Sequence, residues 1–320
     1  MSSKLEQLKK YTVVVADTGE VMSIKKYSPQ DCTTNPSLIY KAAARPEYQS
    51  IVDSAVAWAK TNAPVAGEDR VSNCIDKLAV RFGSELTKLV PGYVSTEVDA
   101  KLSFDRDAMV RKAEKIIALY AEEGVGKERI LVKVAATWEG IRAAEILEKR
   151  GIHCNLTLVF CLAQAVACAD AGGFLISPFV GRITDWYKKA MGKDSFAIAE
   201  DPGVNSVKTI YNYFKQHKYE TVVMGASFRS AAQVEALAGC DRLTVSPALL
   251  EELENDKGTL ECQLSASNTG ERQADVPTDE ASFRWLVSED AMATEKLHEG
   301  IRLFHQDYTK LAQMVAEKLR

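Results

Sequence analysis

Lys133 lies in the middle of the apolar run Ile130-Leu131-Val132-Lys133-Val134-Ala135, a position where a charged side chain is costly. If this run is a strand, its alternation places apolar residues on both faces, as in a fully buried strand. An ammonium group there is unstable unless it is paired or loses its proton. A neutral amine is a nucleophile, and with carboxylates nearby its natural chemistry is Schiff-base formation with a carbonyl.

Polar residues also end the other apolar runs of the chain. They are Asp17, Asn35, Glu97, Asn155 with Thr157, Ser177, Ser227 and Ser246. For any one of them, exposure to water at the end of a strand is the alternative interpretation. As a set they would meet at one end of a parallel barrel, where Asp17 and Glu97 could carry protons for the lysine.

Two arginines follow apolar runs at positions suited to phosphate binding. Arg229 comes two residues after the small-residue turn Gly225-Ala226-Ser227, and Arg182 follows Ser177-Pro178-Phe179 in a similar setting. The ends of late barrel strands frequently bind phosphate. An arginine of this kind taken alone is more often an ordinary surface residue, but both arginines lie just after the carboxyl end of a predicted strand.

Short β-branched runs alternate with segments of helical periodicity, which is typical of a parallel sheet with crossover helices. The predicted strands are Thr12–Asp17, Asp31–Asn35, Tyr93–Glu97, Ile130–Val134, Cys154–Val159, Phe174–Ser177, Thr221–Ser227 and Arg242–Ser246. The predicted helices are Pro36–Lys60, Val71–Val90, Asp107–Glu123, Trp138–Arg150, Leu162–Ala171, Val204–His217 and Ser230–Leu237.

Eight strands in alternation favour one closed (β/α)₈ TIM barrel over residues 1–320, with no boundary between domains. An open doubly wound sheet is the alternative, because alternation alone does not reveal closure. The polar segment Asn255–Thr278 is predicted to be a surface loop, and residues 282–320 are predicted to add helices to the barrel.

Composition excludes several other classes of protein. The 320 residues carry a net charge of −4 without a concentrated basic segment, which argues against nucleic-acid binding. Because we find neither a membrane-length apolar run nor an apolar N-terminus, we expect a cytoplasmic protein without membrane contact. Seven scattered cysteines indicate reduced thiols, and four histidines give too few well-spaced ligands for a zinc site.

Several motifs of this chain resemble those of the transaldolase family. The two signature motifs match Asp31-Cys32-Thr33-Thr34-Asn35-Pro36-Ser37-Leu38 and Ile130-Leu131-Val132-Lys133-Val134-Ala135-Ala136-Thr137-Trp138-Glu139-Gly140-Ile141. Other blocks follow in the family's order, at residues 14–19, 95–99, 176–182 and 224–229. The resemblance implies a homodimeric barrel that works without metal or cofactor in the non-oxidative pentose phosphate pathway. It would move dihydroxyacetone from sedoheptulose 7-phosphate to glyceraldehyde 3-phosphate, giving erythrose 4-phosphate and fructose 6-phosphate.

The resemblance also implies a role for each matching residue. Lys133 would form the Schiff base, Asp17 would take the C4 hydroxyl proton, and Glu97 would shuttle protons through a water shared with Thr157. The groups that bind sugar hydroxyls would be Thr34, Asn35, Asn155 and Ser177, and those that hold the phosphate would be Arg182, Ser227 and Arg229.

Two other functions are compatible with parts of this pattern. A class I aldolase that cleaves fructose 6-phosphate to free dihydroxyacetone would use the same Schiff base. Phe179, however, offers an apolar wall without a proton donor to help water release the fragment, which favours transfer. A catalytically dead barrel that only binds a ligand has no reason to keep buried polar groups at its strand ends.

Overall fold

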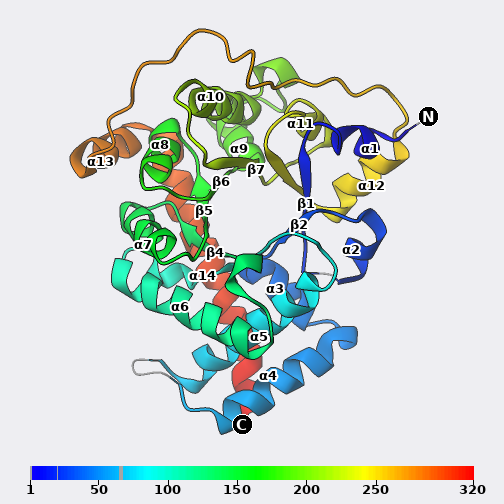
Figure 1. The fold of residues 1–320 in the computed structure, drawn as a ribbon, viewed down its shortest axis with the longest axis vertical. Coiled ribbons are helices and arrows are strands. Elements are labelled where there is room, and N and C mark those ends of the chain that lie inside the picture. The colour runs from blue at the N-terminus through cyan, green and yellow to red at the C-terminus, as the bar shows by residue number, and fades with distance from the viewer. Residues whose placement is uncertain (1, 20, 65–67) are drawn as a thin grey trace.

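The computed structural model describes residues 2–19, 21–64 and 68–320. Its centre is a closed barrel of eight parallel strands in the order β1 to β8, with β1 paired to both β2 and β8 (Figure 1). The strands are β1 Val13–Asp17, β2 Asp31–Thr33, β3 Val94–Glu97, β4 Ile130–Ala135, β5 Cys154–Val159, β6 Leu175–Pro178, β7 Val222–Gly225 and β8 Arg242–Val245. Closure confirms the TIM barrel and excludes the open sheet.

The two faces of β4 show how the barrel is packed. Leu131 points inward and packs with Val15, Leu175 and Met224 in an apolar layer inside the barrel. Val132 and Val134 belong instead to the large cluster that the strands form with the surrounding helices. Lys133, which shares the inward face with Leu131, therefore points into the barrel as the alternation predicted.

Helices cover the outside of the barrel, as Figure 1 shows. They include α5 Arg70–Thr87, α6 Arg106–Glu122, α7 Trp138–Lys149, α8 Leu162–Asp170, α10 Pro202–Gln216 and α11 Ala231–Glu235, whose bounds differ from the predicted ones by at most three residues. In the part of the chain that the structure describes, four α-helices were not predicted: α1 Lys4–Leu8, α2 Val21–Tyr27, α9 Val180–Met191 and α12 Pro247–Asn255.

The predicted helix over residues 36–60 is wrong in one respect, because it is broken in two. Asn35 caps α3 Pro36–Ala43 as expected, and α4 Gln49–Thr61 follows after a short 3₁₀ turn, Pro46–Tyr48. Pro46 causes the break, since a proline lacks the N–H for helix bonding and disfavours helical geometry at the preceding residue. Arg45 is accordingly extended, with φ −85° and ψ 139°.

The C-terminal part of the chain adds two helices, as predicted: α13 Glu280–Glu289 and the long α14 Ala291–Leu319. Helix α14 contacts α3, α4, α5, α9 and β5, and Figure 1 shows it passing along one side of the barrel. Residues 256–279, all of them described, form neither helix nor strand apart from one bridge between Ser265 and Asn268, which confirms the surface loop.

Two further observations concern the cysteines and the hydrophobicity of the helices. All seven cysteines are free, and most of them are buried. Among the described residues, we find no helix that is both long and apolar enough to cross a membrane.

Candidate active site

Lys133 is the centre of the candidate site. It lies on β4 opposite Glu97 of β3, in paired positions of the two strands. Its side chain is 6% exposed, and its Nζ lies 3.6 Å from Glu97 Oε2 and donates to the carbonyl oxygen of Thr34 at 3.4 Å. The amine is thus inside the barrel, with a carboxylate and a carbonyl as its polar neighbours.

Glu97 is held in surroundings that favour its neutral form. Burial raises the pKa of this carboxyl to about 7, although Lys133 and Arg182 oppose the shift. Neither Glu97 Oε2 nor the hydroxyl of Thr157 has a hydrogen-bond partner among the described residues, and both atoms are buried. A carboxyl with a pKa near neutrality can both accept and donate a proton at physiological pH.

Asp17 lies at the end of β1, opposite Thr33 of β2. The hydroxyl of Thr33 donates to Asp17 Oδ1 at 2.9 Å, and a second threonine, Thr244, lies 2.7 Å from that hydroxyl. Burial raises the pKa of Asp17, while the charges of Lys133 and Arg182 and the Thr33 hydrogen bond lower it. Two carboxyls and one amine therefore share the inside of the barrel, where each affects the ionisation of the others.

Asn155 on β5 connects to side chains on β3 and β6. It lies opposite Lys133 in the pairing of β4 and β5. Its Nδ2 donates to Ser95 Oγ at 3.1 Å, and its Oδ1 accepts from Ser177 Oγ at 2.6 Å. Both bonds are buried and together determine which way the amide points.

Thr34 and Asn35 are placed differently from one another. The Thr34 hydroxyl donates to the carbonyl of Ser95 at 2.8 Å, so the contact of Thr34 with Lys133 is made by its backbone. Asn35 Oδ1 accepts from the N–H of Leu38 and begins α3, and the residue also lines the barrel mouth. A helix-capping bond of this kind holds the Asn35 side chain at the mouth.

A cavity of about 240 Å³ opens at the carboxyl ends of the strands. Eight of the predicted site residues line it: Asp17, Asn35, Lys133, Ser177, Phe179, Arg182, Ser227 and Arg229. The other four, Thr34, Glu97, Asn155 and Thr157, are not in its lining. Ser246, one of the polar strand ends, also lines it, and the structure adds Thr33, Ala226, Phe228, Thr244 and Phe304.

Arg182 is half-buried beside two aromatic rings. Its guanidinium carbon lies 4.9 Å from the ring centre of Phe179 and 5.3 Å from that of Phe304 on α14. Burial and the charge of Arg229 lower the pKa of Arg182, and its Nη1 is buried without a hydrogen-bond partner among the described residues. An anion at this position would reduce the repulsion between Arg182 and Arg229 and would accept a hydrogen bond from the unpartnered Nη1.

Arg229 is held at the rim of the cavity. Its Nε and Nη2 donate to Asp185 Oδ2 at 3.1 and 2.8 Å, and its Nη1 donates to the backbone oxygen and the hydroxyl of Ser227, each at 3.3 Å. Ser227 has φ +61°, a left-handed conformation that is strained for a residue with a side chain. The turn directs both the serine hydroxyl and the arginine toward the cavity.

Sequence reasoning missed several of these neighbours for different reasons. Thr33 and Ser95 belong to the matched motifs. Thr33 lies on the strand next to that of Asp17, and Ser95 lies two strands away from Asn155, but the register between strands cannot be read from a single sequence. Phe304 carries no local signal, because only the path of α14 brings it to the barrel mouth.

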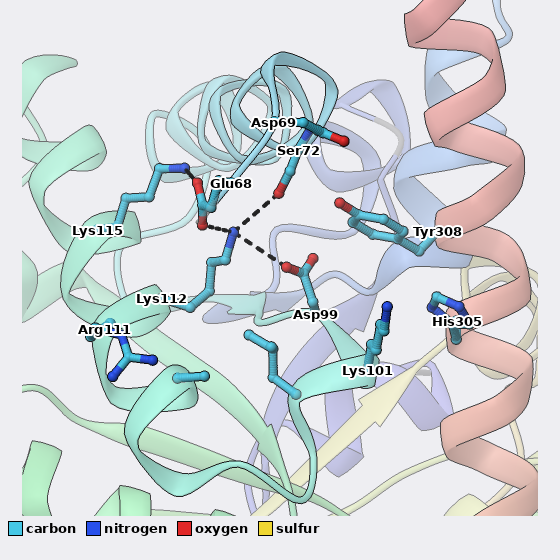
Figure 2. Close-up of a pocket in the computed structure, with 12 residues that line it drawn as sticks. Glu68, Asp69, Ser72, Asp99, Lys101, Arg111, Lys112, Lys115, His305 and Tyr308 are labelled. Carbon is cyan, nitrogen blue, oxygen red and sulfur yellow. Dashed lines mark hydrogen bonds and ion pairs between the residues drawn. The ribbon is translucent and has the colours of Figure 1, made fainter. Parts of the chain in front are cut away.

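A larger cavity, about 680 Å³, lies outside the barrel mouth between α5, α6 and α14, and no predicted site residue lines it. Figure 2 shows Lys112 directed toward Glu68, Ser72 and Asp99, with Tyr308 on the facing helix. Lys112 Nζ lies 2.5 Å from Glu68 and 2.8 Å from Asp76. These ion pairs satisfy the buried charges of the cluster and connect two helices.

A closed (β/α)₈ barrel that holds a buried lysine, two buried carboxyls and two arginines near the carboxyl ends of its strands has the arrangement typical of TIM-barrel enzymes. A family model described as transaldolase/fructose-6-phosphate aldolase matches residues 14–315. The chain belongs to this family, which confirms the resemblance and the expectation of an enzyme.

Curated relatives match over the full length. A protein named transaldolase from Alteromonas mediterranea is 58% identical over 319 residues, covering 100% of this chain and 99% of its own length. Another from Cellvibrio japonicus is 58% identical, covering 99% of each chain. A third, from Rhizobium etli, is 57% identical, covering 100% of this chain and 99% of its own.

Proposed function

We propose that this chain is a transaldolase, a transferase that moves a dihydroxyacetone unit from sedoheptulose 7-phosphate to glyceraldehyde 3-phosphate. The observation that carries this proposal is the buried Lys133 amine, 3.6 Å from Glu97 inside a barrel that Asp17 also faces. Relatives named transaldolase at 58% identity over the whole chain favour transfer over the alternative, release of free dihydroxyacetone from fructose 6-phosphate.

The first stage is formation of the Schiff base. The Lys133 amine attacks the C2 carbonyl carbon, the carbonyl oxygen takes a proton, and the carbinolamine loses water as the C=N bond forms. Glu97 exchanges the protons through a water held with Thr157. The unpartnered Oε2 of Glu97 and hydroxyl of Thr157 support this role, since both can bind that water.

The second stage is cleavage of the bond between C3 and C4. Asp17 takes the proton of the C4 hydroxyl, the C4–O bond becomes a carbonyl, and the electron pair of the broken bond moves into the iminium to form an enamine. The aldehyde product leaves. The acceptor aldehyde then adds to the enamine, with Asp17 returning the proton, and water hydrolyses the resulting imine to release the ketose product and free the Lys133 amine. The Thr33 hydrogen bond supports this role by orienting the carboxylate.

The remaining site residues would bind and orient the sugar. Asn35, Asn155, Ser177 and the Thr34 segment would contact hydroxyl groups, while Arg182, Ser227 and Arg229 would hold the phosphate. Phe179 would form an apolar wall over the bound fragment. Its ring centre lies 5.7 Å from that of Phe160, and this packing supports a fixed position for the Phe179 ring. Without a donor on this wall, water receives little help in releasing the fragment.

The same proposal extends to the setting of the enzyme. The iminium of Lys133 supplies the electron sink, so the reaction needs neither a metal nor a cofactor. We also propose a cytoplasmic homodimer acting in the pentose phosphate pathway. The contribution of α14 to the barrel mouth through Phe304 supports one domain over residues 1–320.

Borohydride trapping tests this function directly. Incubation with fructose 6-phosphate followed by reduction should attach the dihydroxyacetone unit to Lys133, located by peptide mass. Lys133→Ala should abolish trapping, whereas Lys101→Ala, which removes a lysine outside the barrel mouth, should trap normally. An adduct on another lysine would overturn the assignment. Supplying erythrose 4-phosphate should yield sedoheptulose 7-phosphate, and accumulation of free dihydroxyacetone instead would identify an aldolase.

A further inference from the structure

Three buried side chains outside the proposed mechanism lie behind the two arginines of the barrel mouth. They are Thr184 on α9, Asp201 before α10 and Gln233 on α11, exposed by 6%, 5% and 3%. Thr184 and Asp201 lie in the crossover between β6 and β7, and Gln233 lies in the next crossover, between β7 and β8. Buried polar groups are costly unless they are paired, so their arrangement needs a physical reason.

Asp201 is the anchor of this group. Its Oδ1 accepts from the N–H groups of Gly203 and Val204 at 2.9 and 3.0 Å and from the hydroxyl of Thr184 at 2.7 Å. Its Oδ2 accepts from Gln233 Nε2 at 2.9 Å. The carboxylate therefore begins α10 and at the same time holds side chains from both flanking helices.

Gln233 connects this anchor to the turn after β7. Its Oε1 accepts from the backbone N–H of Arg229 at 2.8 Å, and its Nε2 also donates to the hydroxyl of Thr184 at 3.2 Å. Both ends of the amide are thus occupied, and exchanging its oxygen and nitrogen would lose the bonds to the Arg229 N–H and to Asp201. The orientation of Gln233 is determined by Asp201.

The turn that Gln233 holds also contacts the helix that carries Arg182. The N–H of Gly181 donates to the carbonyl of Ser227 at 2.9 Å, and a Cβ at residue 181 would lie 2.3 Å from that oxygen. Ser227 is in the left-handed region, which costs energy and persists only when its surroundings hold it. The position of Arg229 relative to Arg182 therefore depends on how this turn is fixed.

We infer that Gln233, oriented by Asp201 and Thr184, is a positioning residue that sets the spacing of Arg182 and Arg229 for a phosphate dianion. The inference rests on the proposed function, in which these arginines bind the substrate phosphate. Gln233 itself does not line the cavity and acts through the backbone of Arg229. The hydrogen bond from the Arg229 N–H to Gln233 fixes the backbone at residue 229, and this backbone position determines where the Arg229 side chain begins.

Gln233→Glu tests this role with little change in shape. The carboxylate can still accept from Arg229, but it loses the donor to Asp201 and places a second negative charge beside it. The KM for fructose 6-phosphate and the inhibition constant for inorganic phosphate should each rise about tenfold. Borohydride trapping of dihydroxyacetone, which has no phosphate, should proceed at the wild-type rate.

The double variant Gln233→Glu/Asp201→Asn exchanges the amide and the carboxylate between the two positions. One donor and one acceptor again face each other, so phosphate affinity should return to within about threefold of the wild type. Thr184→Val is a milder second probe that keeps the side-chain shape and should raise the same two constants about threefold. It keeps the inference testable if Gln233→Glu does not fold.

Thr221→Val is the matched control. Thr221 is buried just before β7, and its hydroxyl donates to the carbonyl of Gly173 at 2.7 Å, away from the phosphate turn. This variant should lower Tm without changing the phosphate constants. Equal losses for phosphorylated and unphosphorylated substrates, or wild-type constants in Gln233→Glu, would overturn the inference. A wild-type protein that binds no phosphate would instead refute the proposed phosphate site.

Discussion

Glu97 and Lys133 lie opposite each other in neighbouring strands, and the carboxyl oxygen of one is 3.6 Å from the amine of the other. Burial raises the pKa of Glu97 to about 7, while the positive charge of Lys133 opposes that rise. The carboxyl can therefore change its protonation state near neutral pH. Adjacent groups that can exchange a proton are what imine formation requires, since water must leave from the carbon that the amine attacks.

Asp17→Asn should separate cleavage from imine formation. The amide keeps the size of the side chain and its place beside Thr33 but cannot accept the C4 hydroxyl proton. Trapping of the intact ketose on Lys133 should persist, while the rate of carbon–carbon cleavage should fall by about 10²- to 10⁴-fold. Mass spectrometry of the reduced adduct distinguishes the uncleaved from the cleaved unit. Loss of trapping together with cleavage would contradict the separate role of Asp17.

Glu97→Gln should slow formation of the imine itself. The amide cannot relay protons during loss of water, so single-turnover trapping should be slower by about 10²-fold or more. In the wild type, the trapping rate should depend on an ionisation near pH 7, and this dependence should vanish in the variant. If Asp17→Asn and Glu97→Gln both trapped the ketose at the wild-type rate, the role given to Glu97 would be wrong.

The stability of the protein should also reveal the raised pKa of Glu97. Because the folded state keeps this proton up to about pH 7 and the unfolded chain releases it at a lower pH, folding loses stability as the pH rises between those values. The folded state is therefore more stable at low pH, where Glu97 is protonated, than near neutrality, where its ionised form is disfavoured by burial. Denaturant unfolding at several pH values measures the free energy of unfolding. The value for Glu97→Gln should rise by about 1 to 3 kcal/mol relative to that of the wild type between about pH 4.5 and 7.5. A constant difference would mean that Glu97 ionises normally.

Arg229→Ala should affect phosphorylated substrates selectively. A charge-assisted contact with phosphate is worth about 1.5 to 3 kcal/mol, so kcat/KM for fructose 6-phosphate should fall about 10- to 100-fold or more. Activity on unphosphorylated fructose, already poor, should hardly change. Arg229→Lys should restore part of the loss, since an ammonium lacks the planar fork of a guanidinium. Equal losses on both sugars would show that Arg229 supports the fold or the catalytic groups instead.

Local patterns in the chain were sufficient for the order of the elements and for the face that Lys133 occupies. Period-two alternation identifies the inward face of β4, and the apolar residues around Lys133 follow from it. Five of the polar strand ends line one cavity together with Lys133: Asp17, Asn35, Ser177, Ser227 and Ser246. Glu97, Asn155 and Thr157 do not line it. These features depend on residues close together in the chain, so a sequence can predict them.

Relationships between distant segments were decided only by the tertiary structure. Barrel closure requires β1 to pair with β8, and the site requires Phe304 of α14 to pack beside Arg182. The hydrogen bond from Thr33 to Asp17 depends on the register of two strands, and the link from Gln233 to Asp201 depends on the packing of two helices. No periodicity reports such contacts, because their energy comes from burial and pairing across the assembled barrel and not from local preference.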